Sequence, residues 1–161
     1  MFRVGQGHDV HRFDTARKLV LGGVEIPNAL GGLAGHSDAD VLAHAVASAL
    51  LGSLALGDLG QHFPDTDPRW RGASSLDLLR RVVALVRERG WALVNCDATL
   101  VAQEPRLAAY VPQMRENLAR VLEVESNCIS IQATTAEKLG ALGRSEGIAA
   151  HAIALVQRNP A

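Results

Sequence analysis

The sequence predicts an α/β fold, an α+β-like sandwich in which helices cover one face of a mixed β-sheet, built as a single domain over residues 1–161. Along the chain, segments with the alternating pattern of strands are interspersed with segments of helical periodicity. The length of 161 residues suits one domain and leaves too little chain for two. The apolar stretch from Val41 to Gly57 is shorter than a membrane span needs, which indicates a helix buried in a core.

The first half of the chain predicts two strands and this buried helix. Residues 2–13 alternate between the two faces of a strand, and residues 18–27 predict a second strand that forms a hairpin with the first. Ser37 suits the cap of the helix, which is expected to run to about Leu54. Residues 55–73 are rich in Gly, Pro and Asp, so we expect a long loop of the kind that often carries function.

The second half predicts further helices and strands. A helix is expected over residues 74–90, because Ser74 and Asp77 have the spacing of a capping box and Gly90 is placed to end it. Pro112 favours the first turn of another helix. The remaining elements are a strand from Trp91, a strand from Cys128, a short helix after Thr134 and a strand from Gly147 that closes the sheet.

The overall charge and the cysteines argue against several classes of protein. The chain carries 16 Lys and Arg against 17 Asp and Glu, so nothing favours a nucleic-acid partner or a membrane surface. Cys96 and Cys128 lie far apart and form no CxxC pair, which favours a reducing compartment. The first residues lack the apolar run of a signal peptide, so we expect a cytoplasmic protein.

The first candidate site combines a strand with the buried helix. Asp9 and His11 stand two residues apart, so in a strand they point to the same face. His44, on the helix, adds a second imidazole, and Asp40 lies one turn before it, where it could orient His44. Two imidazoles and one carboxylate suit Zn²⁺ with an open fourth position. The alternative is that His11 is a surface residue and His44 a hydrogen-bonded core histidine.

The second candidate site is the predicted strand-to-helix junction ATTAEKLG, residues 133–140. Free amide groups at a helix N-terminus bind anions, and Thr134 and Thr135 add hydroxyl groups. A carboxylate at Glu137 suits a phosphate site only if a cation such as Mg²⁺ lies between the two. The alternative is that Thr134 and Glu137 form a capping box and bind no ligand.

Other polar residues are less specific. Asp58, Asp65 and Asp67 lie in the predicted loop, where Asx turns would explain them as well as binding would. His36 could donate a hydrogen bond to a phosphate or simply belong to a polar turn.

Five segments together resemble the 2-C-methyl-D-erythritol 2,4-cyclodiphosphate synthase family of the non-mevalonate isoprenoid pathway. In order along the chain they are GQGHDVHRF, HSDADVLAHA, ALGDLGQHFPDTDP, AQEPRL and ATTAEKLGALGRSEGI. The resemblance extends over essentially the whole chain. It implies a lyase that cyclises 4-diphosphocytidyl-2-C-methyl-D-erythritol 2-phosphate with release of CMP, the 2-phosphate of the substrate attacking its β-phosphate.

The resemblance also implies cofactors, an assembly and residue roles. Zn²⁺ is held by Asp9, His11 and His44, and Mg²⁺ or Mn²⁺ by Glu137, in a homotrimer with active sites between subunits. His36 and Thr135 match positions that support the transition state. On the methylerythritol phosphate side the expected substrate contacts are Asp9, His11, His36, Ser37, Asp58, Leu59, Gly60, Phe63, Pro64, Asp65, Thr66 and Asp67. The other expected contacts, mainly around the cytidine diphosphate, are Ala102, Pro105, Arg106, Leu107, Ala108, Thr134, Thr135, Ala136, Glu137 and Arg144.

Three positions depart from the pattern of the family, and none is a metal ligand. Ser48 stands where many relatives have Asp, and Ala136 replaces a commonly polar residue. Ala141 replaces an aromatic residue that often lines a channel on the three-fold axis, where some relatives bind an isoprenoid diphosphate with an arginine matching Arg144. Two other functions remain open: a metal-dependent hydrolase of nucleotide diphosphates, and a non-catalytic trimer that binds zinc or isoprenoid diphosphates.

Overall fold

A computed structural model describes residues 1–159, so the last two residues of the predicted domain lie outside the described part. It contains a five-stranded sheet in the order β4-β1-β7-β5-β6 and a separate two-stranded sheet, β2-β3. The strands are β1 (Phe2–Asp14), β2 (Leu19–Leu21), β3 (Val24–Ile26), β4 (Gly32–Leu33), β5 (Trp91–Val101), β6 (Ile129–Thr134) and β7 (Gly147–Arg158). The helices are α1 (Val41–Ser53), α2 (Leu59–His62), α3 (Ser75–Glu88), α4 (Val111–Leu122) and α5 (Gly140–Gly143).

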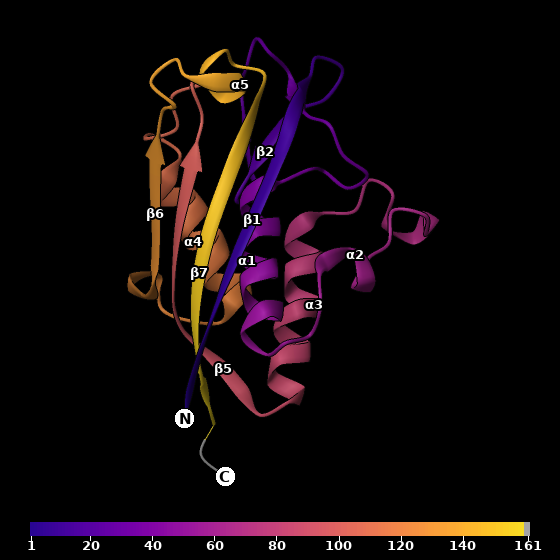
Figure 1. The fold of residues 1–161 in the computed structure, drawn as a ribbon, viewed down its shortest axis with the longest axis vertical. Helices are drawn as coiled ribbons and strands as arrows, with labels where there is room; N and C mark the ends of the chain where they lie inside the picture. Colours follow the sequence, from indigo (N-terminus) through magenta and orange to yellow (C-terminus); the bar gives the residue numbers. More distant parts are fainter. Residues whose placement is uncertain (160–161) are drawn as a thin grey trace.

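The mixed sheet with helices packed on it confirms the predicted fold class (Figure 1). Strand β6 runs parallel to β5, whereas β7 is antiparallel to both β1 and β5. The last strand therefore lies in the middle of the sheet. Buried apolar side chains from the sheet and from α1, α3 and α4 form one core. Within the described residues, no helix is long and apolar enough to cross a membrane.

The predicted hairpin between the first strand and residues 18–27 is wrong. Residues 18–27 instead form a hairpin of their own, in which β2 pairs with β3 around Gly22 and Gly23. Both glycines have positive φ, 55° and 70°, as a tight two-residue hairpin turn requires. Strand β1 pairs with β7 along its length and with β4 only at its end.

The predicted cap of α1 is also wrong. The helix starts at Val41, and its N-cap is Asp40, whose side chain accepts a hydrogen bond from the backbone N–H of Ala43. The same fully buried carboxylate accepts hydrogen bonds from the backbone N–H groups of Gly22 and Gly23. Burial raises the pKa of Asp40, although these hydrogen bonds oppose the shift. Asp40 therefore ties the β2–β3 turn to the start of α1, a long-range contact that the local pattern did not signal.

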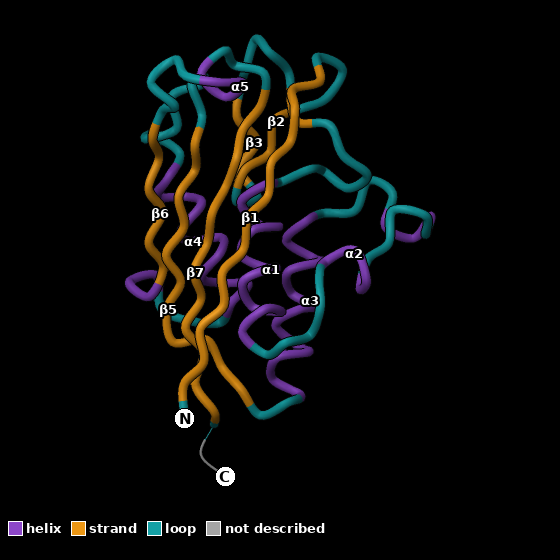
Figure 2. Tube along the Cα trace, viewed as in Figure 1, coloured by secondary structure: helices purple, strands orange, loops and turns teal. Residues whose placement is uncertain are grey.

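The segment before α3 holds more structure than a loop. Residues 55–73 contain α2 and a 3₁₀ turn at Pro68–Trp70, joined by irregular chain (Figure 2). Ser74 is the N-cap of α3, but its side chain makes no capping hydrogen bond, so the predicted capping box does not form. Its expected partner, Asp77, forms an ion pair with Arg80 instead.

Two glycines let α1 lie against β1. A Cβ atom at Gly5 would lie 2.0 Å from the carbonyl oxygen of Ala49, and one at Gly7 would lie 1.9 Å from that of Ala45. These contacts are with helix backbone, so no side-chain rearrangement relieves them. The glycines share the strand face of Asp9, and the close approach brings that face within reach of His44.

We expect Gly7→Ala to destabilise the protein by about 3 kcal/mol or more, beyond the usual range for overpacking, because the clash is with backbone. Thermal unfolding followed by circular dichroism measures the loss. The matched control is Gly52→Ala on α1, where a Cβ would lie 3.6 Å from the carbonyl oxygen of Gln6, an ordinary contact. Alanine favours a helix, so the control should melt at the same or a higher temperature. Equal melting temperatures for Gly7→Ala and the unmodified chain would contradict this account of the packing.

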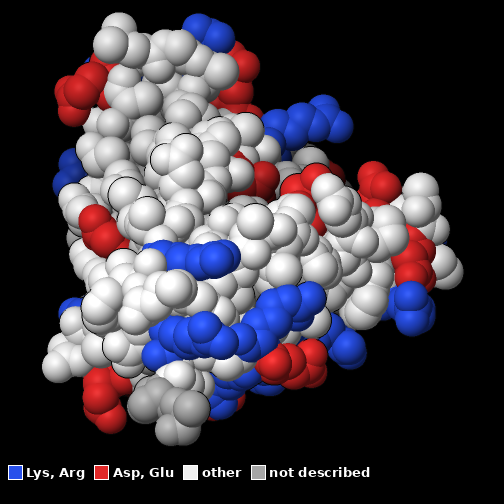
Figure 3. All heavy atoms as spheres, turned by 60° about the horizontal axis from the view of Figure 1, so that its bottom comes forward, with Lys and Arg blue, Asp and Glu red and all other residues white. Residues whose placement is uncertain are grey.

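The opposite face of the sheet is exposed in the single chain. Phe2, Val4 and Val10 of β1 and Ile153 of β7 are each more than half exposed. They alternate with residues that face α1, so they share the face that α1 leaves uncovered. On the side of the molecule shown in Figure 3, basic side chains form short bands with acidic side chains nearby, in line with the near-equal counts of the two kinds.

Candidate functional site

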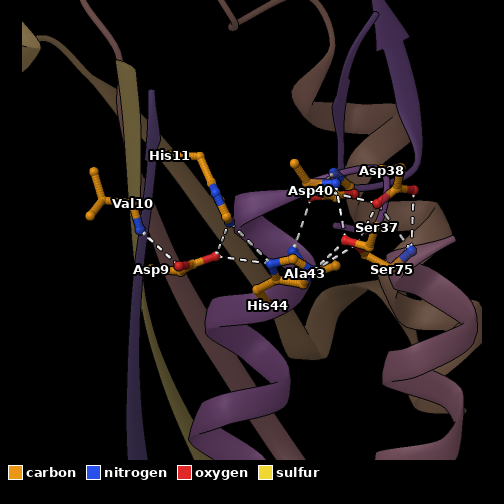
Figure 4. Close-up of polar contacts among 11 residues, drawn as sticks. Asp9, Val10, His11, Ser37, Asp38, Asp40, Ala43, His44 and Ser75 are labelled. Carbon is orange, nitrogen blue, oxygen red and sulfur yellow. Dashed lines mark hydrogen bonds and ion pairs between the residues drawn. The ribbon is translucent and has the colours of Figure 1, made fainter. Parts of the chain in front are cut away.

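Asp9, His11 and His44 form a compact group at the β1–α1 contact (Figure 4). Asp9 Oδ2 lies 2.9 Å from His11 Nε2 and 2.9 Å from His44 Nδ1. The two imidazole nitrogens lie 3.4 Å apart. Ligand atoms bound tetrahedrally to zinc at usual bond lengths stand about 3.3 Å apart. This donor set therefore fits a divalent metal ion.

The Asp9 carboxylate and the His11 imidazole also shift each other's pKa. Burial raises the pKa of Asp9, but hydrogen bonds and charge from His11 and His44 outweigh it and hold the pKa well below its usual value. The hydrogen bond with Asp9 raises the pKa of His11 above its usual 6.5, against an opposing effect of burial. In the metal-free chain, this pair therefore favours an ionised Asp9 beside a protonated His11.

The second nitrogen of His44 faces away from the triad toward two serines. His44 Nε2 lies 2.8 Å from Ser75 Oγ and 3.2 Å from Ser37 Oγ. Asp40 was expected to orient His44, but its carboxylate is occupied by the backbone N–H groups at α1 and the β2–β3 turn. The contacts to His44 Nε2 come instead from Ser75 and Ser37, and nothing in the sequence pattern had singled out Ser75.

A cavity of about 490 Å³ opens beside His11 and His44. Of the expected contacts on the methylerythritol phosphate side, it is lined by His11, His36, Ser37, Leu59, Gly60, Phe63, Pro64 and Asp65. Gly35, Trp70 and Leu78 line it as well, and sequence reasoning missed all three. Trp70 packs edge-to-face on Phe63, with ring centroids 5.1 Å apart. An aromatic residue in a Gly/Pro/Asp-rich segment was the signal that could have found it.

Three expected contacts in the same segment do not line this cavity, and two of them, Asp58 and Asp67, have local roles. Asp58 caps α2 by accepting a hydrogen bond from Gln61 N–H, which lowers its pKa. Asp67 accepts hydrogen bonds from Arg69, which also lower its pKa, and its carbonyl oxygen lies 3.4 Å from His36 Nε2. None of the three residues Asp58, Thr66 and Asp67 lines the cavity beside the triad.

A second cavity, of about 480 Å³, lies where β5 and β6 end. Of the other expected contacts, it is lined by Ala102, Pro105, Arg106, Leu107, Ala108, Thr134, Thr135 and Glu137. Gln103 and Ala133, which belong to the segments AQEPRL and ATTAEKLG quoted for the family resemblance, complete the lining. Ala136 does not line this cavity, and neither does Arg144, which pairs with Glu146.

The short helix predicted after Thr134 is present, but it begins later than the predicted junction at residues 133–140 requires. Thr134 is the last residue of β6, and α5 starts only at Gly140 and spans four residues. Glu137 and Lys138 have positive φ, 49° and 63°, which turns the chain out of a right-handed helix. The Thr134–Glu137 capping box is therefore absent. Instead, the Thr135 hydroxyl donates to the Glu137 carboxylate at 2.8 Å and accepts from the Glu137 backbone N–H.

The two cavities lie toward opposite edges of the sheet. Asp9 pairs with Ala150, Ala150 with Leu100, and Leu100 with Ala133, so one row of residues links the triad to the second cavity. Three strand spacings separate its ends by roughly 14 Å. Figure 1 accordingly shows β6 on one side of the molecule and α2 on the other. Within one chain, the metal triad and the second cavity do not form a single pocket.

Comparisons with known proteins give consistent matches over nearly the whole chain. The family model described as the YgbB family matches residues 2–157. The 2-C-methyl-D-erythritol 2,4-cyclodiphosphate synthase of Symbiobacterium thermophilum is 60% identical over 153 residues, which is 95% of this chain and 97% of the relative. The synthase of Geotalea daltonii is 57% identical, over 97% of this chain and 91% of the relative.

Solved structures also match over nearly the whole chain. The chain superposes on the bifunctional IspDF from Campylobacter jejuni with a TM-score of 0.93 at 41% identity, covering 98% of this chain and 42% of that one. The Plasmodium falciparum IspF, described as a CDP complex, gives a TM-score of 0.85 at 30% identity, with 99% and 97% covered.

Proposed function

This chain belongs to the YgbB family, and we propose that it catalyses the reaction after which its curated relatives are named. It converts 4-diphosphocytidyl-2-C-methyl-D-erythritol 2-phosphate to 2-C-methyl-D-erythritol 2,4-cyclodiphosphate and releases CMP. The observation that carries the proposal is the convergence of Asp9, His11 and His44 beside a cavity large enough for a phosphorylated sugar. The two free cysteines, Cys96 and Cys128, are consistent with work in the cytoplasm.

Asp9, His11 and His44 hold Zn²⁺, and their one-carboxylate, two-imidazole donor set supports this choice. Three protein ligands leave a coordination position for the substrate. When bound, the ion supplies Lewis-acid charge to a phosphate oxygen.

The second cavity takes the cytidine diphosphate part of the substrate. Glu137 supplies an exposed carboxylate to that cavity, and a cation such as Mg²⁺ or Mn²⁺ commonly bridges a carboxylate and phosphates. The hydroxyl of Thr135 fixes the carboxylate through the hydrogen bond at 2.8 Å. Related structures described as CDP complexes support a nucleotide ligand.

The reaction needs no nucleophile from the protein. One phosphorus–oxygen bond forms, from the 2-phosphate to the β-phosphorus, and one breaks as CMP leaves. In phosphoryl transfer, the protein mainly positions the reacting groups and neutralises the charge of the phosphates. Phe63 and Trp70 line the cavity beside the triad with aromatic surface, and His36 offers an imidazole to a phosphate.

The working enzyme is a homotrimer in which each active site combines halves of two neighbouring subunits. The metal triad and the Glu137 cavity lie toward opposite edges of the sheet, so one chain cannot join them. A head-to-tail ring brings one edge of each chain to the other edge of its neighbour. The exposed apolar face, with Phe2, Val4 and Ile153, is suited to burial in such an assembly.

We expect the gain in melting temperature caused by zinc to grow between about pH 6 and about pH 8. Contact with Asp9 raises the pKa of His11 above its usual 6.5. Without metal, the Asp9–His11 pair therefore stabilises the fold fully below pH 6.5, and this stabilisation is lost as the pH rises through the raised pKa of His11. Zinc binds the neutral imidazole and therefore competes with this proton. Melting curves with and without zinc across this range measure the difference. If the zinc-induced gain in melting temperature is constant or shrinks with rising pH, His11 is not a zinc ligand of the proposed kind.

The test of the proposed function is incubation of the purified chain with the diphosphocytidyl substrate, Zn²⁺ and Mg²⁺, followed by ³¹P NMR. The proposal requires CMP and a cyclic diphosphate in equal amounts. Linear phosphate products would indicate a hydrolase instead. Tight binding without release of CMP would indicate a non-catalytic binding protein.

A further inference from the structure

A serine at the start of α3 contacts the nitrogen of His44 that points away from the metal triad. Ser75 is the first residue of α3 and is 1% exposed. Its Oγ lies 2.8 Å from His44 Nε2, closer than Ser37 Oγ at 3.2 Å. Figure 4 shows this contact on the side of His44 that faces away from Asp9. A helix 31 positions further along the chain thus reaches a residue of the metal triad.

Asp38 fixes the direction of this hydrogen bond. The Ser75 hydroxyl and the Ser75 backbone N–H both bond to the Asp38 carboxylate, the N–H at 3.1 Å. An ionised carboxylate only accepts, so the hydroxyl proton of Ser75 points to Asp38. A lone pair of Ser75 Oγ is then left for His44, and Nε2 must be the donor.

The donor role of Nε2 determines what the other nitrogen can do. A neutral imidazole carries one N–H, so a proton held at Nε2 leaves Nδ1 free to act as a ligand once a metal ion takes the place of the proton shared with Asp9. Nδ1 is the atom that faces Asp9 and His11. We propose that Ser75, oriented by Asp38, is a positioning residue that selects the metal-binding tautomer and the ring orientation of His44. The proposal rests on the metal site of the proposed function.

The simpler account is that Ser75 only helps to begin α3. Against it, Ser75 lies after the N-cap, and the contacts of its hydroxyl go to Asp38, Ser37 and His44. Serine is also a poorer helix former than alanine. A purely structural role therefore predicts that Ser75→Ala leaves metal affinity unchanged.

The experiment measures Zn²⁺ affinity by competition with a chromogenic chelator. We expect Ser75→Ala to bind Zn²⁺ about 10- to 100-fold more weakly, the range found for loss of partners that orient a ligand. Ser75→Thr retains the hydroxyl and should stay within about threefold of the unmodified chain. The matched control is Ser74→Ala, because the neighbouring serine is exposed and makes no capping hydrogen bond. Its affinity should not change.

A second measurement does not depend on affinity. In the zinc-loaded chain, NMR of ¹⁵N-labelled histidine should show a slowly exchanging Nε2 proton on His44. Ser75→Ala should speed this exchange, and Ser74→Ala should not. Equal affinity and equal exchange in Ser75→Ala and the unmodified chain would overturn the positioning role while leaving the zinc site intact. Absence of zinc binding by the unmodified chain would overturn the zinc site and this proposal together.

Discussion

His44→Ala is expected to abolish zinc binding and, with it, turnover. The substitution removes one of the three ligand atoms that converge beside the cavity. Loss of an orienting partner alone costs up to about 100-fold in metal affinity, so loss of a ligand should cost at least that much. Elemental analysis of the purified variant measures zinc per chain, and the cyclisation assay measures the accompanying loss of activity.

The control is His62→Ala, which removes an imidazole whose contact is with the carbonyl oxygen of Leu56, away from the triad. This control should keep its full zinc content. Circular dichroism establishes that both variants are folded. A folded His44→Ala protein with full zinc content would show that His44 is only a hydrogen-bonded core residue.

Glu137→Gln is expected to lower kcat by about 100- to 1,000-fold, the cost of losing one group that stabilises developing charge. Glutamine keeps the shape of the side chain but removes the negative charge that would hold a cation. Because no capping box forms at Glu137, the substitution removes no helix cap, and the melting temperature should stay the same. Stopped assays at saturating substrate and varied Mg²⁺ measure the effect.

Glu116→Gln is the matched control, because it makes the same change at an exposed site on α4. We expect unchanged turnover and an unchanged dependence on Mg²⁺. Near-normal turnover of Glu137→Gln at limiting Mg²⁺ would remove Glu137 from the proposed cation site.

Much of the fold could be predicted because its signals are local. The alternation in β1 placed Asp9 and His11 on one face, and the apolar stretch after Asp40 indicated the buried helix that carries His44. The segments quoted for the family resemblance were also sufficient to identify the family, since the comparisons confirm it. The mixed sheet with packed helices is confirmed, whereas the trimer stays a prediction.

The errors occurred where distant parts of the chain meet. Asp40, rather than Ser37, caps α1, because its carboxylate also bonds to the turn at Gly22 and Gly23. The contact of Ser75 with His44 depends on how α3 packs beside α1, and no spacing in the sequence reports it. One error is local: the short helix after Thr134 begins only at Gly140, because left-handed backbone at Glu137 and Lys138 intervenes, which residue type alone did not signal.

Each active site is expected to be shared between two chains. This expectation is tested by mixing two inactive variants, His44→Ala and Glu137→Ala, which are denatured together in equal amounts and allowed to reassemble. In a head-to-tail ring, a site works only when its metal half comes from the Glu137 variant and its nucleotide half from the His44 variant. For random reassembly, the probability of each of these two conditions is about one half. About a quarter of normal activity should therefore return.

The control is the unmodified protein carried through the same procedure, which sets the activity that reassembly can recover. Each variant alone is treated in parallel to give the background. We predict about a quarter of the control activity in the mixture. Activity in the mixture no higher than that of either variant alone, with good recovery of the control, would contradict a site shared between these two residues.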